Sequence, residues 1–477
     1  MIKGDSKLSC PLSLDPQSRR YFLPHKVIGP FLCLIWLMPV WVGAETLVGM
    51  PVVEDFVHTW HSLQDQFSTK GVNFEIINTI DVLTPISGGL HRKTATAGVL
   101  DLLLTINGEK FFGLKDSTFF MYGLGIYGEN PSNNVGDVQA VSSLAAPTTW
   151  KLFEVWYQQN FFNERLSILA GLYDVTSEFD VIRSSAELFL NGSFGTGAEF
   201  AASGRIGPST FPATSLAVRG QAILNDAIAI RAVIADGVPG DPNDPNGTEI
   251  HLRSDDGIFF GTEFSYYTFP EEGIKEDGEG ILSKRQFRLG FSRVGRAAPM
   301  EYQGKYAVGI WGYTTELNDL SEVNNSGNPI RRDGTYGLYG LAEQMVFHEH
   351  EDATQGLILF ARAGVADPRV NRFSQYYGGG LVYRGLLRGR PTDEMGFGIA
   401  AALNGSHFER AQRQVGIRVN DVEVTVEFTY AINFTHEVLI QPNIQYVINP
   451  STNPSIADAL VLGVRLGFDL DWFEREE

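Results

Sequence analysis

The chain has 477 residues and a formal net charge of −19, with 56 Asp and Glu against 37 Lys and Arg. This acidic balance excludes a nucleic-acid partner, which would require clustered Lys and Arg. Mean hydropathy is −0.06, so the chain as a whole is not a bundle of membrane helices.

One long apolar run lies near the N-terminus. The basic residues Arg19, Arg20 and Lys26 precede residues 27–42 (VIGPFLCLIWLMPVWV), and the small residue Ala44 follows. This order predicts a secretory signal peptide over residues 1–44. The alternative, a membrane anchor, fits less well because two prolines interrupt a run that is short for a span. Both cysteines, Cys10 and Cys33, lie in the leader, so the exported chain is expected to have no disulfide.

Residues 45–71 are predicted to contain a short amphipathic helix before the first strand. Apolar side chains recur there at three- and four-residue spacings, at Val53, Phe56, Val57, Trp60, Leu63 and Phe67. Gly71 is well placed to end such a helix.

The rest of the chain, residues 72–468, is predicted to be all-β. Segments of alternating apolar and polar residues are separated by turn signals. Seventeen segments fit: Val72–Leu83, Val99–Ile106, Thr118–Tyr127, Leu152–Asn160, Arg165–Tyr173, Leu216–Ile223, Ala227–Ala235, Ile258–Phe269, Arg285–Val294, Lys305–Tyr313, Tyr336–Phe347, Leu357–Val365, Gln375–Tyr383, Gly396–Leu403, Val422–Phe434, Glu437–Ile448 and Ala459–Phe468. Gly195–Ala202 is a weaker eighteenth. Single-chain outer-membrane barrels have even strand numbers, so we expect sixteen strands, with eighteen as the alternative.

The connections between these strands alternate in length. Asn160–Glu164 and Asn225–Asp226 are short, whereas Glu129–Pro147, Asp236–Asp256 and Asn318–Gly334 are long and polar. Short turns at one end and long loops at the other are typical of an antiparallel up-and-down barrel that spans an outer membrane.

The length of the apolar faces separates a lipid-facing barrel from a soluble β-protein. Val422–Phe434 (VEVTVEFTYAINF) places an unbroken apolar set on one face and Glu423 and Glu427 on the other. Soluble strands average about five or six residues, and this one is twice as long. A closed transmembrane barrel of about sixteen strands is therefore predicted, with a water-filled interior and a short C-terminal extension over residues 469–477.

No cofactor, metal site or enzymatic activity is predicted. Gly123–Gly128 matches GxGxxG, but it lies inside a predicted strand with no helix after it. A dinucleotide site is not predicted, because that motif must follow a strand and open a helix. His348–Glu351 falls where a strand ends, and a solvated turn accounts for it.

The polar faces of the strands supply candidate pore-lining residues. Their carboxylates, guanidinium groups and amides can exchange hydrogen bonds with sugar hydroxyls, and aromatic rings can stack on a sugar ring. In one strand Glu154, Trp156 and Gln158 share a face opposite Phe153. Further candidates on polar faces are Arg219, Gln221, Arg231, Lys305, Glu343, Arg362, Glu427, Gln441, Gln445 and Arg465.

Lys151–Asp180 (KLFEVWYQQNFFNERLSILAGLYDVTSEFD) closely resembles the strand–turn–strand signature of the carbohydrate-selective porins, the OprB family. Its elements E-x-W-x-x-Q, L-x-x-x-x-G and D-x-x-x-E-F are here Glu154, Trp156, Gln159, Leu166, Gly171, Asp174, Glu178 and Phe179. The segments VEFTY, QPNIQYVINP and LVLGVRLGF look like the family's last three strands. The resemblance implies a sixteen-stranded barrel in the outer membrane of a Gram-negative bacterium, through which sugars diffuse passively. It also points to Asp174 and Glu178 as pore residues.

The expected partners are permeating sugars, outer-membrane lipid and lipopolysaccharide, with the protein a monomer or a homo-oligomer. Two alternatives stay open from the sequence. A general or anion-type porin would have a more one-sidedly basic lumen. An exported soluble β-rich carbohydrate-binding protein would be released without detergent.

Overall fold

The structure, a computed structural model, describes residues 66–241, 244–269, 303–350, 352, 354–434 and 438–469. The chain divides into two units, Met1–Asp55 and Phe56–Glu477, and all described residues belong to the second. The predicted signal peptide, residues 45–65 of the predicted helix, the predicted strand Arg285–Val294 and residues 470–477 lie outside the described residues.

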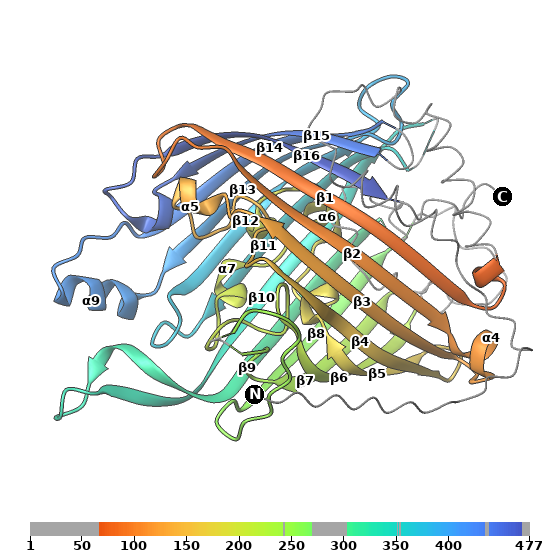
Figure 1. The fold of residues 1–477 in the computed structure, drawn as a ribbon, viewed down its shortest axis with the longest axis horizontal. Coiled ribbons are helices and arrows are strands. Elements are labelled where there is room, and N and C mark those ends of the chain that lie inside the picture. The colour runs from red at the N-terminus through yellow and green to blue at the C-terminus, as the bar shows by residue number, and fades with distance from the viewer. Residues whose placement is uncertain are drawn as a thin grey trace, which may run out of the picture. The chain divides into compact units, whose positions relative to one another are not determined.

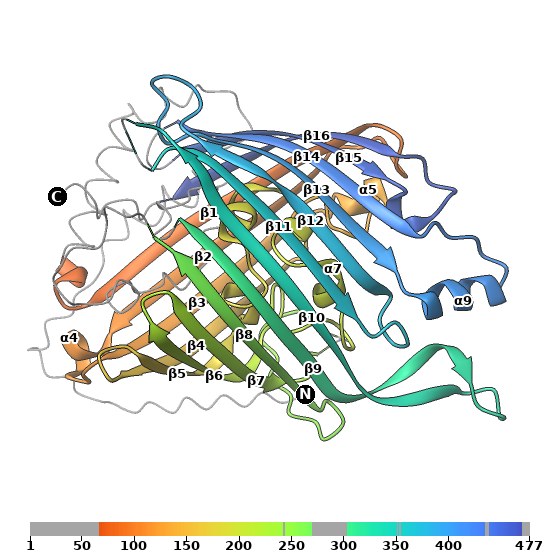
Figure 2. The same ribbon diagram turned by 180° about the vertical axis from the view of Figure 1, so that it is seen from behind.

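Sixteen antiparallel strands form a closed barrel in which each strand pairs with its neighbours in chain order, and β16 closes on β1 (Figures 1 and 2). This arrangement leaves no unpaired edge. The strands are β1 (Val72–Ser87), β2 (Ala95–Asn107), β3 (Ser117–Gly128), β4 (Thr149–Phe161), β5 (Leu166–Tyr173), β6 (Ser215–Asn225), β7 (Ile228–Asp236), β8 (Ile258–Thr268), β9 (Gly304–Val323), β10 (Pro329–His348), β11 (Gly356–Ala366), β12 (Phe373–Arg384), β13 (Glu394–Asn404), β14 (Val422–Asn433), β15 (Val438–Ile448) and β16 (Ala459–Asp469).

The predicted barrel of sixteen strands is confirmed. Because β8 pairs directly with β9, the ring closes without the predicted strand Arg285–Val294. The weaker prediction of a strand over Gly195–Ala202 is wrong, since this segment contains a short helix, α7 (Ala198–Ala201), in the connection between β5 and β6.

The two faces of the strands are separated as a lipid-facing barrel requires. On β14, Phe428 points outward with 43% of its surface exposed, whereas its neighbour Glu427 is fully buried inside. Ile444 on β15 and Leu466 on β16 are exposed in the same way. Exposed apolar and enclosed polar side chains invert the order of a soluble sheet, because the barrel's outer surface faces hydrocarbon.

One residue of β4 departs from the predicted alternation. Phe153 was expected on the face opposite Glu154, but both side chains are buried inside the barrel. The register between β3 and β4 shifts at this point, where Tyr122 pairs with Glu154 and Gly123 with Leu152. The extra residue of this bulge turns the Phe153 ring inward, against Tyr122 at 5.1 Å between ring centroids.

The prediction of a long loop over Asn318–Gly334 is also wrong. β9 and β10 continue as a paired ribbon beyond the other strands (Figure 1), and only residues 324–328 connect them. Outside the membrane both faces of a strand meet water, so a polar composition is compatible with pairing there. The salt bridge between Arg331 and Glu316, at 2.6 Å, joins the two strands in this part.

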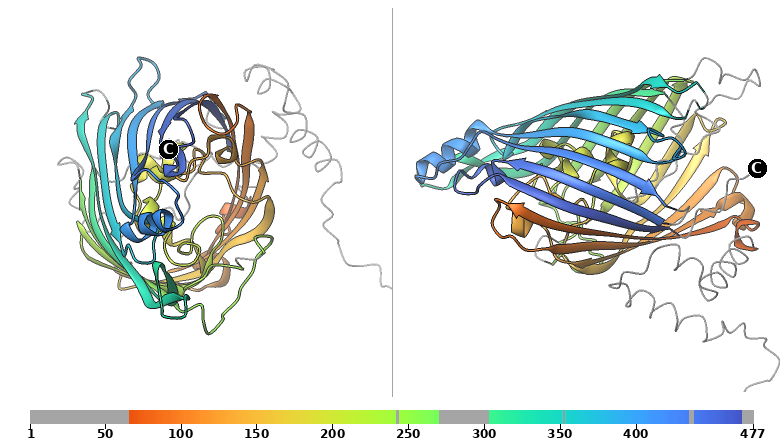
Figure 3. Two further views of the ribbon diagram at one scale, coloured as in Figure 1. Left: turned by 90° about the vertical axis from the view of Figure 1, so that its left-hand side faces the viewer. Right: turned by 90° about the horizontal axis from the view of Figure 1, so that it is seen from above.

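Two of the long loops turn into the barrel. Loop 129–148 joins β3 to β4 and contains α5 (Ser132–Val135). Loop 174–214 joins β5 to β6 and contains η1 (Val175–Ser177), α6 (Arg183–Leu188), η2 (Gly192–Phe194) and α7. Figure 3 shows the yellow segments of the second loop within the ring of strands.

The other short helices lie at the two ends of the barrel. They are α4 (Gly108–Phe112) at the short-turn end, and α9 (Ser406–Gln414) and η4 (Pro450–Thr452) at the long-loop end. Among the described residues, no helix is long and apolar enough to cross a membrane.

Candidate functional site

The interior of the barrel is narrowed by loops 129–148 and 174–214, whose backbone is held by side chains of the wall. Loops enclosed within a barrel must satisfy their backbone polar groups without free access to water. Five glutamates on the inward faces of the strands accept hydrogen bonds from loop amides. These anchoring glutamates are Glu154 on β4, Glu263 on β8, Glu343 on β10, and Glu423 and Glu427 on β14.

Two of them each bind a pair of successive amides of loop 174–214. Glu343 accepts from the amides of Arg183 and Ser184 at 3.2 and 3.0 Å, at the start of α6. Glu427 accepts from the amides of Leu190 and Asn191, at 2.7 and 3.0 Å. A carboxylate has two oxygens and so can satisfy two donors at once. These contacts tie the start of α6 to β10 and the segment just after it to β14, four strands away in the ring.

Glu154, Glu263 and Glu423 complete the set. Glu154 accepts from the amide of Asp174 at 2.7 Å, and Glu263 from the amide of Asp180 at 3.1 Å. Glu423 instead holds loop 129–148, with the amides of residues 138 and 139 at 3.1 and 3.0 Å. Glutamate carboxylates on widely separated strands therefore bind the backbone of both loops.

Side chains with N–H or O–H groups hold the loop carbonyls in the same manner. Arg362 on β11 donates to the carbonyls of Asp180 and Gly195, at 2.5 and 3.0 Å. The other donors are Lys305 to Val181, Tyr376 to Ser193, Gln441 to Leu188 and Gln445 to Val141. Both kinds of backbone group are thus matched, and the loops are fixed in position.

A chain of alternating charges joins loop 174–214 to strands β6 to β11. Glu178 accepts from Nε of Arg219 at 2.7 Å and lies 3.7 Å from Arg231. Arg231 lies 3.8 Å from Glu263, which pairs with Lys305 at 3.2 Å. Burial alone would raise the pKa of the Glu178 carboxyl, but Arg219 and Arg231 hold it below its usual value. Glu178 is therefore ionised at neutral pH.

The far end of the network lies at α7. Asp180 pairs with Arg362 at 3.3 Å, and burial raises its pKa to about 6. Glu199 on α7 is fully buried, and neither of its oxygens meets hydrogen-bond geometry with any described group. Burial and the neighbouring Asp180 raise the pKa of Glu199 to about 8. Glu199 is thus mostly protonated at pH 7.

The position of Glu199 predicts a pH-dependent channel. An acid whose native pKa lies above its ordinary value of 4.5 binds an extra proton when folded, so its contribution to loop docking falls as pH rises from about 4.5 to 8. We expect loop 174–214 to be held less firmly at pH 9 than at pH 6. Single-channel conductance should therefore rise over this range, and Glu199→Gln should abolish the rise. An unchanged pH profile in the variant would contradict this assignment.

The residues predicted from the sequence all lie on the inward side of the barrel or in loop 174–214. Most of them bind loop backbone or belong to the chain of alternating charges. Asp174 caps η1 by accepting from the amide of Thr176 at 2.8 Å. Gln158 accepts from Arg219 at 2.8 Å, and Gln221 accepts from Arg231 at 2.7 Å.

Trp156 and Arg465 lie apart from that network. Trp156 stacks on Phe120 with ring centroids 4.8 Å apart. Arg465 pairs with Asp81 at 2.7 Å and donates to Ser143 of loop 129–148 at 3.1 Å. The predicted residues are thus enclosed by the barrel, as the alternation of the strands indicates, while their role as pore-lining residues stays a prediction and their contacts with the loops were not predicted.

Several residues of the site were not among the candidates. Glu263 could have been found from its strand, because it shares a face with Ser265 opposite Phe260 and Phe264. Asp180 and Glu199 could not, because they lie in an irregular loop where alternation carries no information.

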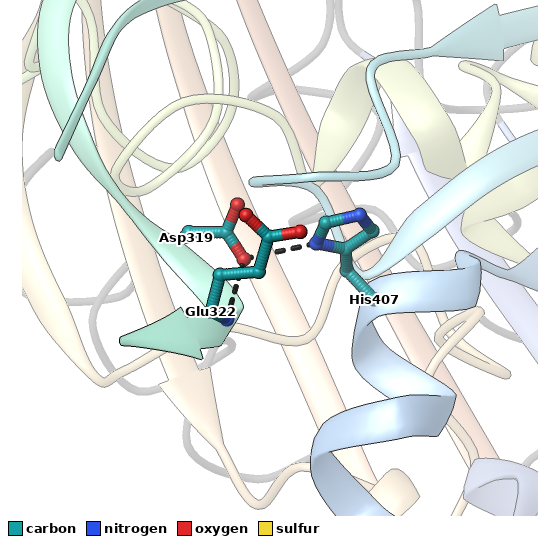
Figure 4. Close-up of side chains that lie close together, drawn as sticks. All are labelled: Asp319, Glu322 and His407. Atoms are coloured by element: carbon teal, nitrogen blue, oxygen red, sulfur yellow. Dashed lines mark hydrogen bonds and ion pairs between the residues drawn. The ribbon is translucent and has the colours of Figure 1, made fainter. Parts of the chain in front are cut away.

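A second cluster lies outside the barrel, in the outer half of the β9–β10 ribbon, near the turn that joins the two strands. Asp319 and Glu322 of β9 meet His407 of α9, with potential ligand atoms within 4.8 Å of one another (Figure 4). Nδ1 of His407 lies 2.9 Å from a carboxylate oxygen of Asp319, within hydrogen-bond distance. Arg332 pairs with Asp319 at 2.7 Å and with Glu322 at 2.8 Å. Because the Arg332 guanidinium already neutralises the charge of both carboxylates, we interpret the cluster as a structural contact that holds α9 against the ribbon.

Comparison with known proteins agrees with this geometry. A family model described as "Carbohydrate-selective porin, OprB family" matches residues 91–470. Porin B of Pseudomonas aeruginosa is 23% identical over 440 residues, which cover 85% of this chain and 89% of that protein. A putative porin, QuiX, of Acinetobacter baylyi is 26% identical over 35% of this chain and 40% of its own length.

Solved structures show the same fold. The high-pH structure of Pseudomonas putida OprB has a TM-score of 0.71 at 20% identity and covers 86% of this chain and 97% of its own. The low-pH structure of that protein has a TM-score of 0.52 at 17% identity, covering 86% of this chain and 96% of its own. The family match extends from the first connection of the barrel to its last strand, and on this evidence the chain belongs to the carbohydrate-selective porins of the OprB family.

Proposed function

We propose that loops 129–148 and 174–214 form the selective constriction of this outer-membrane porin, through which carbohydrates diffuse passively. Family membership supports the function, and the observation that carries the constriction is the anchoring of both loops inside the barrel by wall side chains. A fixed narrowing suits a channel that discriminates by size and by weak contacts, because the solute must also leave.

The charges of the wall and of loop 174–214 favour neutral solutes. Glu178, Asp180 and Glu263 alternate with four cationic side chains, Arg219, Arg231, Lys305 and Arg362. In the part of the chain that the structure describes, these paired charges of both signs do not form the one-sidedly basic path that an anion-type porin needs. We propose that uncharged monosaccharides or small oligosaccharides are preferred over anions.

Individual wall residues are proposed to shape the path. Glu154, Gln158, Asp174, Glu178, Arg219, Gln221, Arg231, Glu427, Gln441, Gln445 and Arg465 are proposed to line or support the constriction, with Trp156 as its aromatic wall. The outward apolar belt is proposed to contact lipid, and the loop end lipopolysaccharide. Cross-linking in native membranes would distinguish a monomer from a homo-oligomer.

Reconstituted protein provides the direct test of this function. We expect conductance in a planar bilayer that added neutral sugar reduces, and sugar entry into proteoliposomes. Conductance that sugar leaves unchanged, together with a strong preference for anions, would instead identify an anion-type porin.

Trp156 offers a focused test within the wall. We expect Trp156→Ala to change the rate of sugar entry into proteoliposomes, because removing the indole leaves Phe120 without its stacking partner and alters the shape of the wall. Trp150→Ala is the matched control, since Trp150 lies on the same strand but points outward, 62% exposed. Equal rates for the two variants would remove Trp156 from the site.

A further inference from the structure

A cavity of about 720 Å³ opens at the long-loop end of the barrel, apart from the constriction. It lies between the β1–β2 connection and the two ends of loop 129–148. Its polar lining includes His91, Lys93, Glu129, Asn130 and Asn133, and Pro147 adds an apolar surface. Its volume falls within the range of about 300–1,000 Å³ that is usual for small-molecule sites.

The lining suits a neutral, hydroxyl-rich solute. Asn130 and Asn133 each carry both a donor and an acceptor group, and the imidazole of His91 can serve as either. Lys93 and Glu129 form a salt bridge at 3.0 Å, so the two charges compensate each other. Each of these two side chains remains more than half exposed, which leaves further donor and acceptor positions open. Compensated charge with many hydrogen-bonding groups favours a sugar over an ion.

The frame of the cavity is held by its own hydrogen bonds. The carbonyl of Asn134 accepts from the amides of Leu90 and His91, both at 2.8 Å. The side-chain amide of Asn134 donates to the carbonyl of Lys93 at 3.1 Å. The two walls are thereby tied together before any solute arrives, which lowers the entropic cost of binding.

The cavity is connected to the constriction through the chain itself. Residues 129, 130, 133, 134 and 146–148 contribute to its lining, while the middle of the same loop runs into the barrel. There Ser142 donates to Asp81 at 2.7 Å, and the carbonyl of Val141 accepts from Gln445 at 2.8 Å. One loop thus borders both the cavity at the mouth and the narrowing inside.

We propose that this cavity is an entry site for neutral saccharides, where a mono- or disaccharide binds weakly before it passes the constriction. The proposal rests on the function proposed above and adds to it a second, external subsite. When external sugar is dilute, a weak site at the mouth raises the sugar concentration next to the constriction. It does not change the maximal rate at which sugar passes the constriction.

The test compares two charge-neutral double variants at the same end of the barrel. Lys93→Ala/Glu129→Ala removes the salt bridge that borders the cavity, and Arg331→Ala/Glu316→Ala removes an equally exposed salt bridge on the β9–β10 ribbon. Uptake of glucose and of maltose into proteoliposomes is measured over a wide concentration range. We expect the cavity variant alone to raise the half-saturating concentration, by about fivefold for the loss of one net hydrogen bond, with maximal flux and ion conductance unchanged.

The outcomes separate the entry site from the function on which it rests. Normal wild-type flux with the same half-saturating concentration in both variants would overturn the entry site alone. No sugar flux in the wild type would overturn the proposed function as well. Loss of copurifying lipopolysaccharide from the cavity variant, with an unchanged flux curve, would assign the cavity to membrane saccharide and overturn the proposal.

Discussion

Replacing Glu427 by alanine is expected to release loop 174–214 from the wall, raising single-channel conductance and weakening the block by sugar. The carboxylate binds two loop amides and the side-chain amide of Asn443, the last at 2.6 Å. Each buried donor left without a partner costs about 1–3 kcal/mol. Two such donors in the loop cost at least about 2 kcal/mol, which shifts the equilibrium between docked and released loop by about thirtyfold or more.

Three further measurements make this expectation specific. Glu427→Gln keeps one acceptor oxygen and should give an intermediate conductance. Glu316→Ala, at an exposed position on the β9–β10 ribbon, should leave conductance unchanged. Retention of the heat-modifiable gel band would show that the barrel itself is intact in each variant. Wild-type conductance in Glu427→Ala would mean that other contacts suffice to hold the loop.

The barrel could be predicted from the sequence because lipid imposes a strict pattern. A strand in the hydrocarbon needs an unbroken apolar face, and Val422–Phe434 shows this in its residues alone. The same rule explains where prediction failed. The ribbon of β9 and β10 continues past the membrane, where no apolar face is required, so the polar composition of Asn318–Gly334 predicts a loop although the segment is largely paired.

The loops inside the barrel escaped prediction for another reason. Segment Gly195–Ala202 reads GTGAEFAA, which has no strict alternation and gives only a weak strand signal, and in the structure α7 forms there inside the ring of strands. What decides its conformation is contact with distant parts of the chain. Glu427, for example, binds the amide of Leu190, 237 residues away. Such pairs are set by how the barrel closes and leave no local signal.

The polar faces were located correctly, but their polarity has two possible causes that the sequence cannot separate. A glutamate facing water and a glutamate bound to a loop amide occupy the same inward position in a strand. Glu154 and Glu427 were predicted for their possible contact with sugar, and in the structure each binds loop backbone. Their effect on selectivity is therefore expected to act through the position of the loops.

Glu178→Ala is expected to lower the free energy of unfolding by about 3–5 kcal/mol, the usual cost of breaking a buried ion pair from one side. Glu178 is the carboxylate partner of Arg219 at 2.7 Å, and both side chains are almost fully buried. Among the described residues, Arg219 would then keep hydrogen bonds with the neutral side chains of Ser167 and Gln158 alone. The temperature at which the folded gel band disappears measures the loss, and Glu316→Ala, in an exposed pair, should cost no more than about 1 kcal/mol.

A double variant distinguishes a broken pair from simple loss of packing. Replacing both partners, as Glu178→Met/Arg219→Met, removes the uncompensated charge, and apolar replacement of a buried pair is often neutral or stabilising. We therefore expect the double variant to be more stable than Glu178→Ala, a non-additivity that contacting residues commonly show. If the double variant loses as much stability as Glu178→Met and Arg219→Met lose when made separately and summed, the pair is not coupled. Glu178 would then act through its contact with Tyr173. Recovery would establish that loop 174–214 is held to β6 by charge, so that the constriction and the stability of the barrel depend on the same residues.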